Sequence, residues 1–198
     1  MNTSQSTHKR FAIVLSLLSL LGAGLVVGRT PAGAADARDA TPHVNAITPE
    51  AAGKYLIQSA GCNDCHTPGW METGGKTPEA LWLTGVPVGW RGPWGTTYAS
   101  NLRRFVQPFT EEQFVHLVRT RNSRPPMPWM SLHAMSDRDL TAIYRYIRSL
   151  PLEGDVMPDY VPPELEPKTP FFSMVPQNLP AAVRTQASAK AQAPLDAR

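Results

Sequence analysis

The stretch AGCNDCHTPG, residues 60–69, contains both cysteines of the chain, and a histidine directly follows the second. Zinc sites, redox-active dithiols and covalent haem attachment sites all use such patterns. A structural zinc site needs four ligands, whereas Cys62, Cys65 and His66 supply three that lie too close in sequence to surround one ion well. A dithiol of the thioredoxin type needs a β-α-β context, and no convincing strands flank this stretch.

The C-x-x-C-H pattern is typical of covalent haem attachment. On one helical turn, the thiols of Cys62 and Cys65 can both add to the two vinyl groups of a single haem. The imidazole of His66 then lies beneath the iron as the proximal ligand. Both cysteines are used and none is left over. We therefore predict one covalent haem c; the single motif excludes several haems in this chain, and a dithiol is the alternative.

The first 34 residues have the pattern of an export signal. Residues 1–10 are polar and end in a basic pair, residues 11–27 are apolar, and a stretch of small residues around Ala34 follows. This order is that of a secretory signal peptide. The alternative is an uncleaved membrane anchor, residues 11–28, although the apolar run is slightly short for a span of about 20 residues. In either case we expect the folded part to be periplasmic.

The formal net charge of +3 does not indicate nucleic-acid binding. Cleavage after Ala34 removes Lys9, Arg10 and Arg29 and brings the net charge to zero. The distribution is uneven, however, because residues 91–124 contain six arginines and only two acidic residues. Such a stretch is typical either of a docking face for an acidic partner or of an ordinary solvated surface.

Capping signals predict three helices. Thr48-Pro49-Glu50 opens the first, which runs to about Ser59 and contains Gly53, a sign of a close helix crossing. A capping box at residues 110–113 opens the second. Ser136 caps the third, whose apolar residues recur at helical spacing until Pro151 ends it. Residues 67–108 are rich in Gly, Pro and Trp, and we expect irregular chain there, wrapped around a cofactor.

The stretch RPPMPWMSLHAMS, residues 124–136, supplies candidates for the second axial ligand of an iron. Met127 is the first choice, because prolines at 125, 126 and 128 restrict the backbone around it. Met130 is the second choice and His133 the third. A thioether favours ferrous iron and raises the reduction potential, whereas a second imidazole lowers it.

Four stretches carry a resemblance to a known family: GKYLIQSAGCNDCHTPG (53–69), YASNL (98–102), PPMPWMSLHAMSDRDLTAIYRYIRSLP (125–151) and TPFFSMVPQNLP (169–180). They resemble class I c-type cytochromes, in particular the single-haem cytochromes and cytochrome subunits that accompany bacterial periplasmic dehydrogenases. The resemblance implies an all-α fold around one haem, with His66 as the proximal ligand and Met127 as the distal ligand. In such relatives a different sequence follows the asparagine, where this chain has Leu102-Arg103-Arg104.

Further residues are expected around the haem. Asn101 is a candidate hydrogen-bonding partner near a propionate, and Arg91, Arg103 and Arg124 are candidate ion-pair partners, because a buried carboxylate needs one. Trp129 is a candidate for the haem surroundings.

The expected organisation has five parts: a signal peptide or anchor (1–34), a linker (35–47), a cytochrome c domain (48–151), an extended Pro-rich segment packed on it (152–180) and a disordered tail (181–198). The predicted function is one-electron transfer from a periplasmic dehydrogenase to a downstream acceptor, by a carrier or a dehydrogenase subunit that is not itself an enzyme. A haem enzyme or sensor with a labile distal site is the alternative. We expect no nucleic-acid partner, and membrane attachment only if the N-terminal segment is uncleaved.

Overall fold

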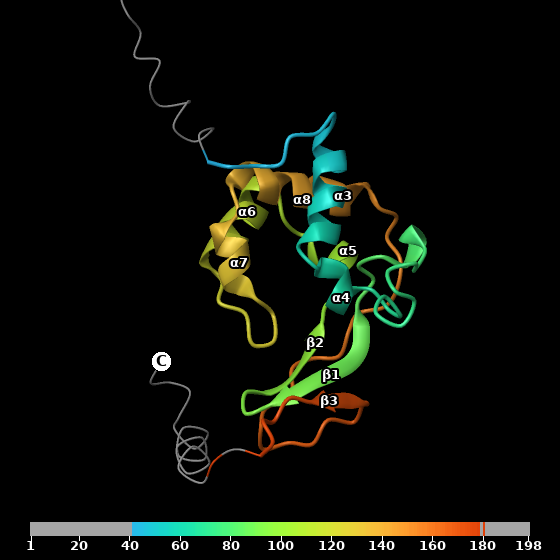
Figure 1. Ribbon diagram of the computed structural model, residues 1–198, viewed down its shortest axis with the longest axis vertical. Coiled ribbons are helices and arrows are strands. Elements are labelled where there is room, and N and C mark those ends of the chain that lie inside the picture. The colour runs from blue at the N-terminus through green and yellow to red at the C-terminus, as the bar shows by residue number, and fades with distance from the viewer. Residues whose placement is uncertain (1–40, 179, 181–198) are drawn as a thin grey trace, which may run out of the picture. The chain divides into compact units, whose positions relative to one another are not determined.

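The computed structural model describes residues 41–178 and 180 (Figure 1). The predicted export signal (1–34), the start of the predicted linker and the predicted disordered tail (181–198) lie outside these residues. None of the helices in the described part is long and apolar enough to cross a membrane.

Two crossing helices, α3 (Pro49–Ser59) and α8 (Asp137–Ser149), form the centre of the helical part. Gly53 allows the crossing, because a Cβ at this position would lie 2.0 Å from the carbonyl oxygen of Ala142 and 2.7 Å from the Cβ of Tyr146. The close helix crossing that the sequence predicted at Gly53 is confirmed. The buried side chains around it form the hydrophobic core, which includes Ile57, Leu83, Val106 and Ile147.

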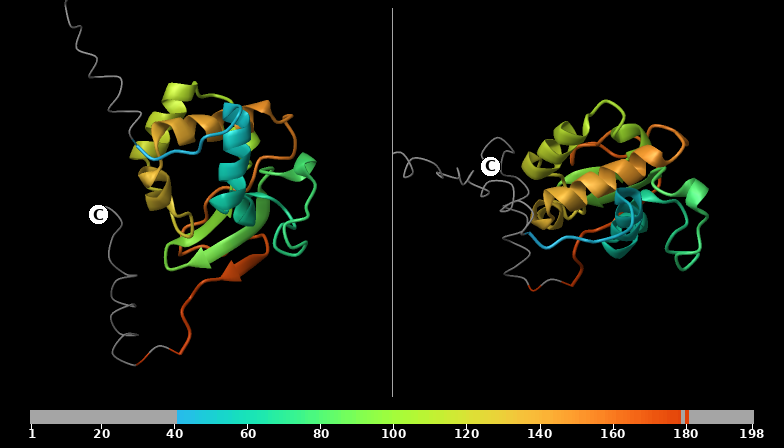
Figure 2. Two further views of the ribbon diagram at one scale, coloured as in Figure 1. Left: turned by 45° about the horizontal axis from the view of Figure 1, so that its top comes forward. Right: turned by 90° about the horizontal axis from the view of Figure 1, so that it is seen from above.

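Shorter helices surround this pair (Figure 2). Helix α6 (Glu111–Thr120) packs on α8, and α7 (Trp129–Ala134) packs on α6. Helix α4 (Cys62–His66) follows α3, and α5 (Leu102–Phe105) and a 3₁₀ turn, η1 (Glu79–Leu81), lie in the connection that follows. The predicted caps are confirmed: Thr48 and Ser136 each accept a backbone N–H, and Thr110 with Gln113 forms the capping box.

The all-α prediction is wrong, because the chain also contains a three-stranded sheet. Strands β1 (Val86–Gly92) and β2 (Gly95–Ala99) form an antiparallel hairpin. Strand β3 (Phe171–Ser173) pairs parallel to β1, so that the order is β2-β1-β3. The structure is therefore mixed α/β, and the stretch expected to be irregular contains two of the three strands.

Strand β1 lacks the alternating hydrophobic residues by which a strand is usually predicted from sequence. Pro87 and Gly89 interrupt the alternation, and a register shift lies between Val86 and Trp90. Proline and glycine are depleted in strands and are found there at edges and bulges. The signals that were present are the turn Gly92–Gly95 and the β-favouring run of two threonines and a tyrosine in β2.

Arginines hold the segment after α8 against the rest of the protein. Arg91 donates to the carbonyls of Pro163 and Leu165 and pairs with Glu166. Arg104 donates to the carbonyl of Gly154. The basic stretch of the sequence therefore does not form one free docking face, since several of its guanidinium groups bind the chain's own carbonyl groups.

Arg103 is the most deeply buried of these arginines, with no exposed surface. Its guanidinium donates to the carbonyls of Glu79 and Ala80 in η1, to that of Trp82 and to that of Pro151 after α8. Burial lowers the pKa of this guanidinium. One buried cation thus joins two segments that lie far apart in the sequence.

We expect Arg103→Met to destabilise the protein by about 3 kcal/mol, because four carbonyl groups lose a charged donor in a buried position. The matched control is Arg104→Met, since Arg104 is exposed and donates to one carbonyl; its expected cost is below about 1 kcal/mol. Urea unfolding of both variants measures the difference. Equal stability of the two variants would contradict the role of the buried guanidinium.

Candidate functional site

The two cysteines and the histidine lie on one short helix, α4, which follows α3 through a tight turn. Gly61 makes this turn with φ of 69°, a conformation that favours glycine. Both thiols are free and half-buried, so Cys62 and Cys65 do not form a disulfide with each other. The five residues place the two thiols within one helical turn, with the imidazole directly after them.

The imidazole of His66 is buried and held by one hydrogen bond. Its Nδ1 lies 2.7 Å from the carbonyl oxygen of Ser100. A carbonyl only accepts, so Nδ1 carries the proton and donates, and Nε2 keeps its lone pair for a ligand. Burial lowers the pKa of His66, which favours the neutral imidazole that binds metals. The histidine is therefore in the tautomer and protonation state of an axial ligand.

A network of hydrogen bonds behind α4 fixes its position. The Thr67 hydroxyl donates to the side-chain oxygen of Asn63 at 2.7 Å and accepts from the backbone N–H of Leu83 at 2.8 Å. The backbone N–H of Gly85 donates to the carbonyl of His66 at 2.8 Å. Asn63 and Thr67 are both buried. The helix is thus held on its inner side by residues 83–85, and His66 cannot rotate freely.

The environment of the thiols differs from that of a redox-active dithiol. Burial raises the pKa of the Cys62 thiol to about 12 and also raises the pKa of Cys65, and the carboxylate of Asp64 adds to both effects. A redox dithiol depends on a thiolate whose pKa is lowered by a helix N-terminus or a nearby cation. Two neutral thiols beside a neutral, oriented imidazole fit haem attachment better, so the residues present fit the group that the motif predicts.

The segment with the predicted distal ligands is attached to the sheet and to the C-terminal segment. The Thr97 hydroxyl in β2 donates to the carbonyl of Pro125 at 2.7 Å. The guanidinium of Arg124 lies 3.9 Å from the centre of the Tyr160 ring. These contacts restrain the loop on the N-terminal side of Met127, which is half-buried.

The other candidates for the distal position lie in less suitable surroundings. Met130 is 58% exposed, and Met135 packs against the hydrophobic core. The ring of His133 lies 4.9 Å from that of Trp129 and within 3.3 Å of the carbonyl of Arg121. Trp129 begins α7. Met127 therefore stays the first choice.

Two residues predicted near a propionate have other partners in the structure. Asn101 is buried, caps α5, and donates to the carbonyls of Glu153 and Asp155. Arg91 binds residues 163–166, as described above. Their contact with a haem stays a prediction, while their observed role is to attach the segment after α8.

Sequence reasoning missed the carbonyl of Ser100, which orients His66. A backbone carbonyl has no sequence signal of its own, although the stretch YASNL surrounds it. The buried hydrogen-bonding role of Arg103 was also missed, because its pattern of four carbonyl partners depends on the tertiary fold.

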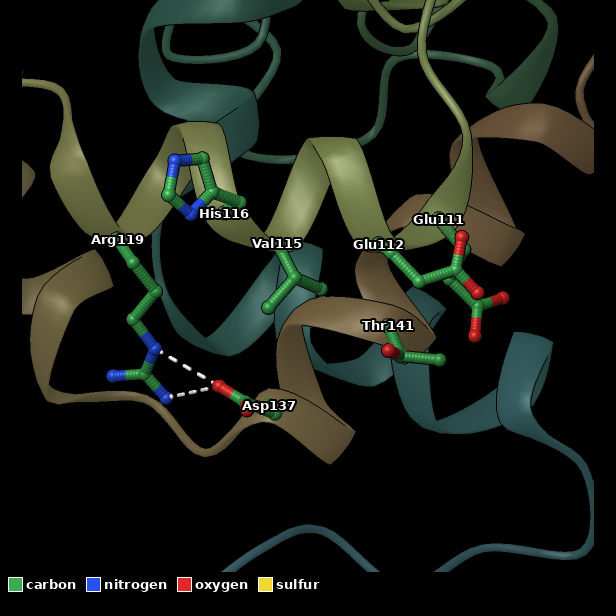
Figure 3. Close-up of a pocket in the computed structure, with 7 residues that line it drawn as sticks. All are labelled: Glu111, Glu112, Val115, His116, Arg119, Asp137 and Thr141. Carbon is green, nitrogen blue, oxygen red and sulfur yellow. Dashed lines mark hydrogen bonds and ion pairs between the residues drawn. The ribbon is translucent and has the colours of Figure 1, made fainter.

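A separate hollow lies between α6 and the start of α8 (Figure 3). Arg119 points to Asp137 across it and forms an ion pair, whereas His116 points away from that pair. Glu111 at the other end is bonded to Arg145. Among residues 41–178 and 180, no group of three or more His, Cys, Asp or Glu side chains is placed to hold a metal ion. This hollow has the character of an ordinary solvated helix surface.

Comparisons of the chain with protein-family models, with curated proteins and with solved structures find no match.

Proposed function

We propose that this protein is a monohaem c-type cytochrome that carries single electrons. The observation that carries this proposal is the arrangement of side chains on α4. Two free thiols on one helical turn precede a buried imidazole, whose Nδ1 is hydrogen-bonded to a backbone carbonyl. This arrangement would supply two attachment points and one oriented iron ligand in five residues. The raised thiol pKa values favour it over the exported dithiol oxidoreductase.

Each residue has a role that follows from its position. Cys62 and Cys65 would hold the cofactor as thioethers, and His66 would bind its iron through Nε2 while Ser100 keeps the ring from turning. Met127 would supply the second iron ligand, held by a loop restrained through Pro125 and Arg124. The bound haem supplies the ferrous–ferric couple that carries the electron. If His66 and Met127 both bind the iron, the protein would set the reduction potential and exclude other ligands.

The proposed donor is a periplasmic dehydrogenase, and the proposed acceptor is a component of the respiratory chain. A labile distal site would instead indicate a haem enzyme or sensor. The identity of the distal ligand separates these functions.

We expect Met127→Ala to remove the methionine–iron bond, so that the ferrous protein binds carbon monoxide and the reduction potential falls, because a thioether raises the potential of a haem. The matched control is Met130→Ala, which removes an exposed methionine from the same segment and should leave the spectrum unchanged. Visible spectroscopy of both oxidation states, with and without carbon monoxide, measures the effect. Ready carbon monoxide binding by the unaltered ferrous protein would favour the sensor or enzyme instead.

A further inference from the structure

Strand β3 has one edge that no other strand among residues 41–178 and 180 covers. It is the outermost strand in the order β2-β1-β3, and Figure 2 shows it at the margin of the sheet. All three of its residues are exposed, Phe171 by 41% and Phe172 by 57%. Natural sheets protect such edges with charged residues or proline, and also by keeping the edge strand short, as β3 is. Residues 169–178, TPFFSMVPQN, contain no charge, and no proline lies within β3 itself.

The pairing with β1 determines which backbone groups of β3 are free. The Pro170 carbonyl accepts from Gly89, and the N–H of Met174 donates to Arg91. In a parallel ladder, alternate residues of a strand bond the same neighbour, so the N–H and C=O of Phe172 also face β1. Phe171 and Ser173 therefore direct their N–H and C=O outward. No hydrogen bond from the described residues reaches these four groups.

These four free groups match one particular partner, a second β3 strand running in the opposite direction. In an antiparallel pair, two opposite residues exchange both N–H···O bonds, and the residues between them form a non-hydrogen-bonded pair about 4.5 Å apart at Cα. With Phe172 on a two-fold axis, Phe171 of each chain pairs with Ser173 of the other. The outward N–H and C=O groups of Phe171 and Ser173 then all form hydrogen bonds. Because the pair is two-fold symmetric, both chains make the same set of contacts.

Neighbouring contacts favour this register. A shift that placed Ser173 on the axis would pair Phe171 with Val175, whose carbonyl accepts from the Gln177 side chain. The Phe172-centred register places Lys168 opposite Pro176 and Glu166 opposite Asn178, so no like charges meet. The rings of Trp90 and Phe172 already lie 6.3 Å apart on one face. A second copy extends them into a row of four aromatic rings.

We propose that this protein forms a weak, two-fold symmetric homodimer in which β3 strands pair antiparallel across Phe172. The paired segment is short, so the interface belongs to the small class, with less than about 1,200 Å² buried and with association that depends on concentration. The proposal stands on the sheet edge alone and does not depend on the proposed haem.

Sedimentation velocity of the purified full protein over a wide range of concentrations tests this proposal. We expect a reversible shift from monomer to dimer as the concentration rises. Amide hydrogen exchange at Phe171 and Ser173 should slow with the same concentration dependence. A protein that stays monomeric at every concentration would overturn the proposal. Binding of a different protein to the β3 edge would not rescue it.

Charge substitution at Phe172 tests the two-fold axis itself, because that residue faces its own symmetry mate. We expect Phe172→Lys and Phe172→Glu each to weaken self-association about tenfold, through loss of the aromatic pair and like-charge repulsion. An equal mixture of the two variants should associate again as a heterodimer. The matched control is Leu165→Lys, which adds the same charge at a side chain that is 59% exposed outside the strand. The proposed register would be contradicted if both Phe172 variants dimerised as well as the unaltered protein. It would also be contradicted if the mixture formed no heterodimer.

Discussion

The double variant Cys62→Ala/Cys65→Ala is expected to contain no covalently bound haem. In the proposed cytochrome each thiol would add to one vinyl group, so removal of both would leave no thioether bond between chain and cofactor, and His66 alone would not retain the haem through denaturation. A haem stain after denaturing electrophoresis measures this loss directly. The proteins should be produced together with a haem-attachment system, so that the variant and the unaltered chain have the same opportunity to react.

Single substitutions refine this result. Cys62→Ala or Cys65→Ala should leave at most one thioether and one unreacted vinyl group, which shifts the spectrum of the reduced, denatured haem to longer wavelength. The control is Asp64→Ala, which lies between the cysteines, is exposed and leaves the C-x-x-C-H pattern intact. If the double variant stained as strongly as this control, the attachment site would have to lie elsewhere.

Gly53→Ala is expected to destabilise the protein by about 3 kcal/mol. Helix propensity alone predicts the opposite sign, a gain of up to about 1 kcal/mol for alanine over glycine. The tertiary contact decides, because the new Cβ would lie 2.0 Å from the Ala142 carbonyl oxygen and 2.7 Å from the Tyr146 Cβ, both parts of α8 that cannot move without separating the helices. Overpacking of this kind typically costs 1–3 kcal/mol or more.

Thermal unfolding measures this effect, and a loss of about 3 kcal/mol corresponds to a midpoint lower by roughly 10 °C. The control is Gly74→Ala, where no atom lies within 4 Å of an added Cβ but φ is 61°. That variant isolates the backbone cost of about 1 kcal/mol in a left-handed conformation. A Gly53→Ala protein as stable as the unaltered chain would show that α3 and α8 do not cross as closely as described.

The helical part of this fold follows from local signals in the sequence. Thr48, Thr110 and Ser136 each supply a side-chain oxygen directly before an amphipathic segment, and each caps a helix in the structure. Gly53 inside an otherwise regular helix indicated a close crossing, which the structure confirms. Helix caps and helical periodicity depend on residues within about four positions of each other. They can therefore be predicted from the sequence alone.

The sheet did not follow from such signals. Strand β1 contains Pro87 and Gly89, and its parallel partner β3 lies about eighty residues later in a segment rich in proline. What stabilises β3 is backbone pairing together with the hydrogen bonds of Arg91 to residues 163–166, and both depend on tertiary contacts. The side chains of Phe171 and Phe172 are 41% and 57% exposed.

The candidate site was predicted in part. The positions of Cys62, Cys65 and His66 follow from a local motif, and the structure places them on one helix. The groups that orient them are distant in sequence: the Ser100 carbonyl binds His66, and Leu83 and Gly85 hold the inner side of α4. These partners contribute backbone atoms, which any residue type supplies, so the sequence carries no specific signal for them.

The central claim, one haem bound covalently to this chain through both cysteines, is tested most directly by intact mass spectrometry of the denatured protein after production with a haem-attachment system. We expect the mass of the chain plus one haem. We also expect proteolysis to assign the added mass to a peptide containing Cys62 and Cys65. A chain mass without any addition, with two titratable thiols, would contradict the account and indicate a dithiol protein.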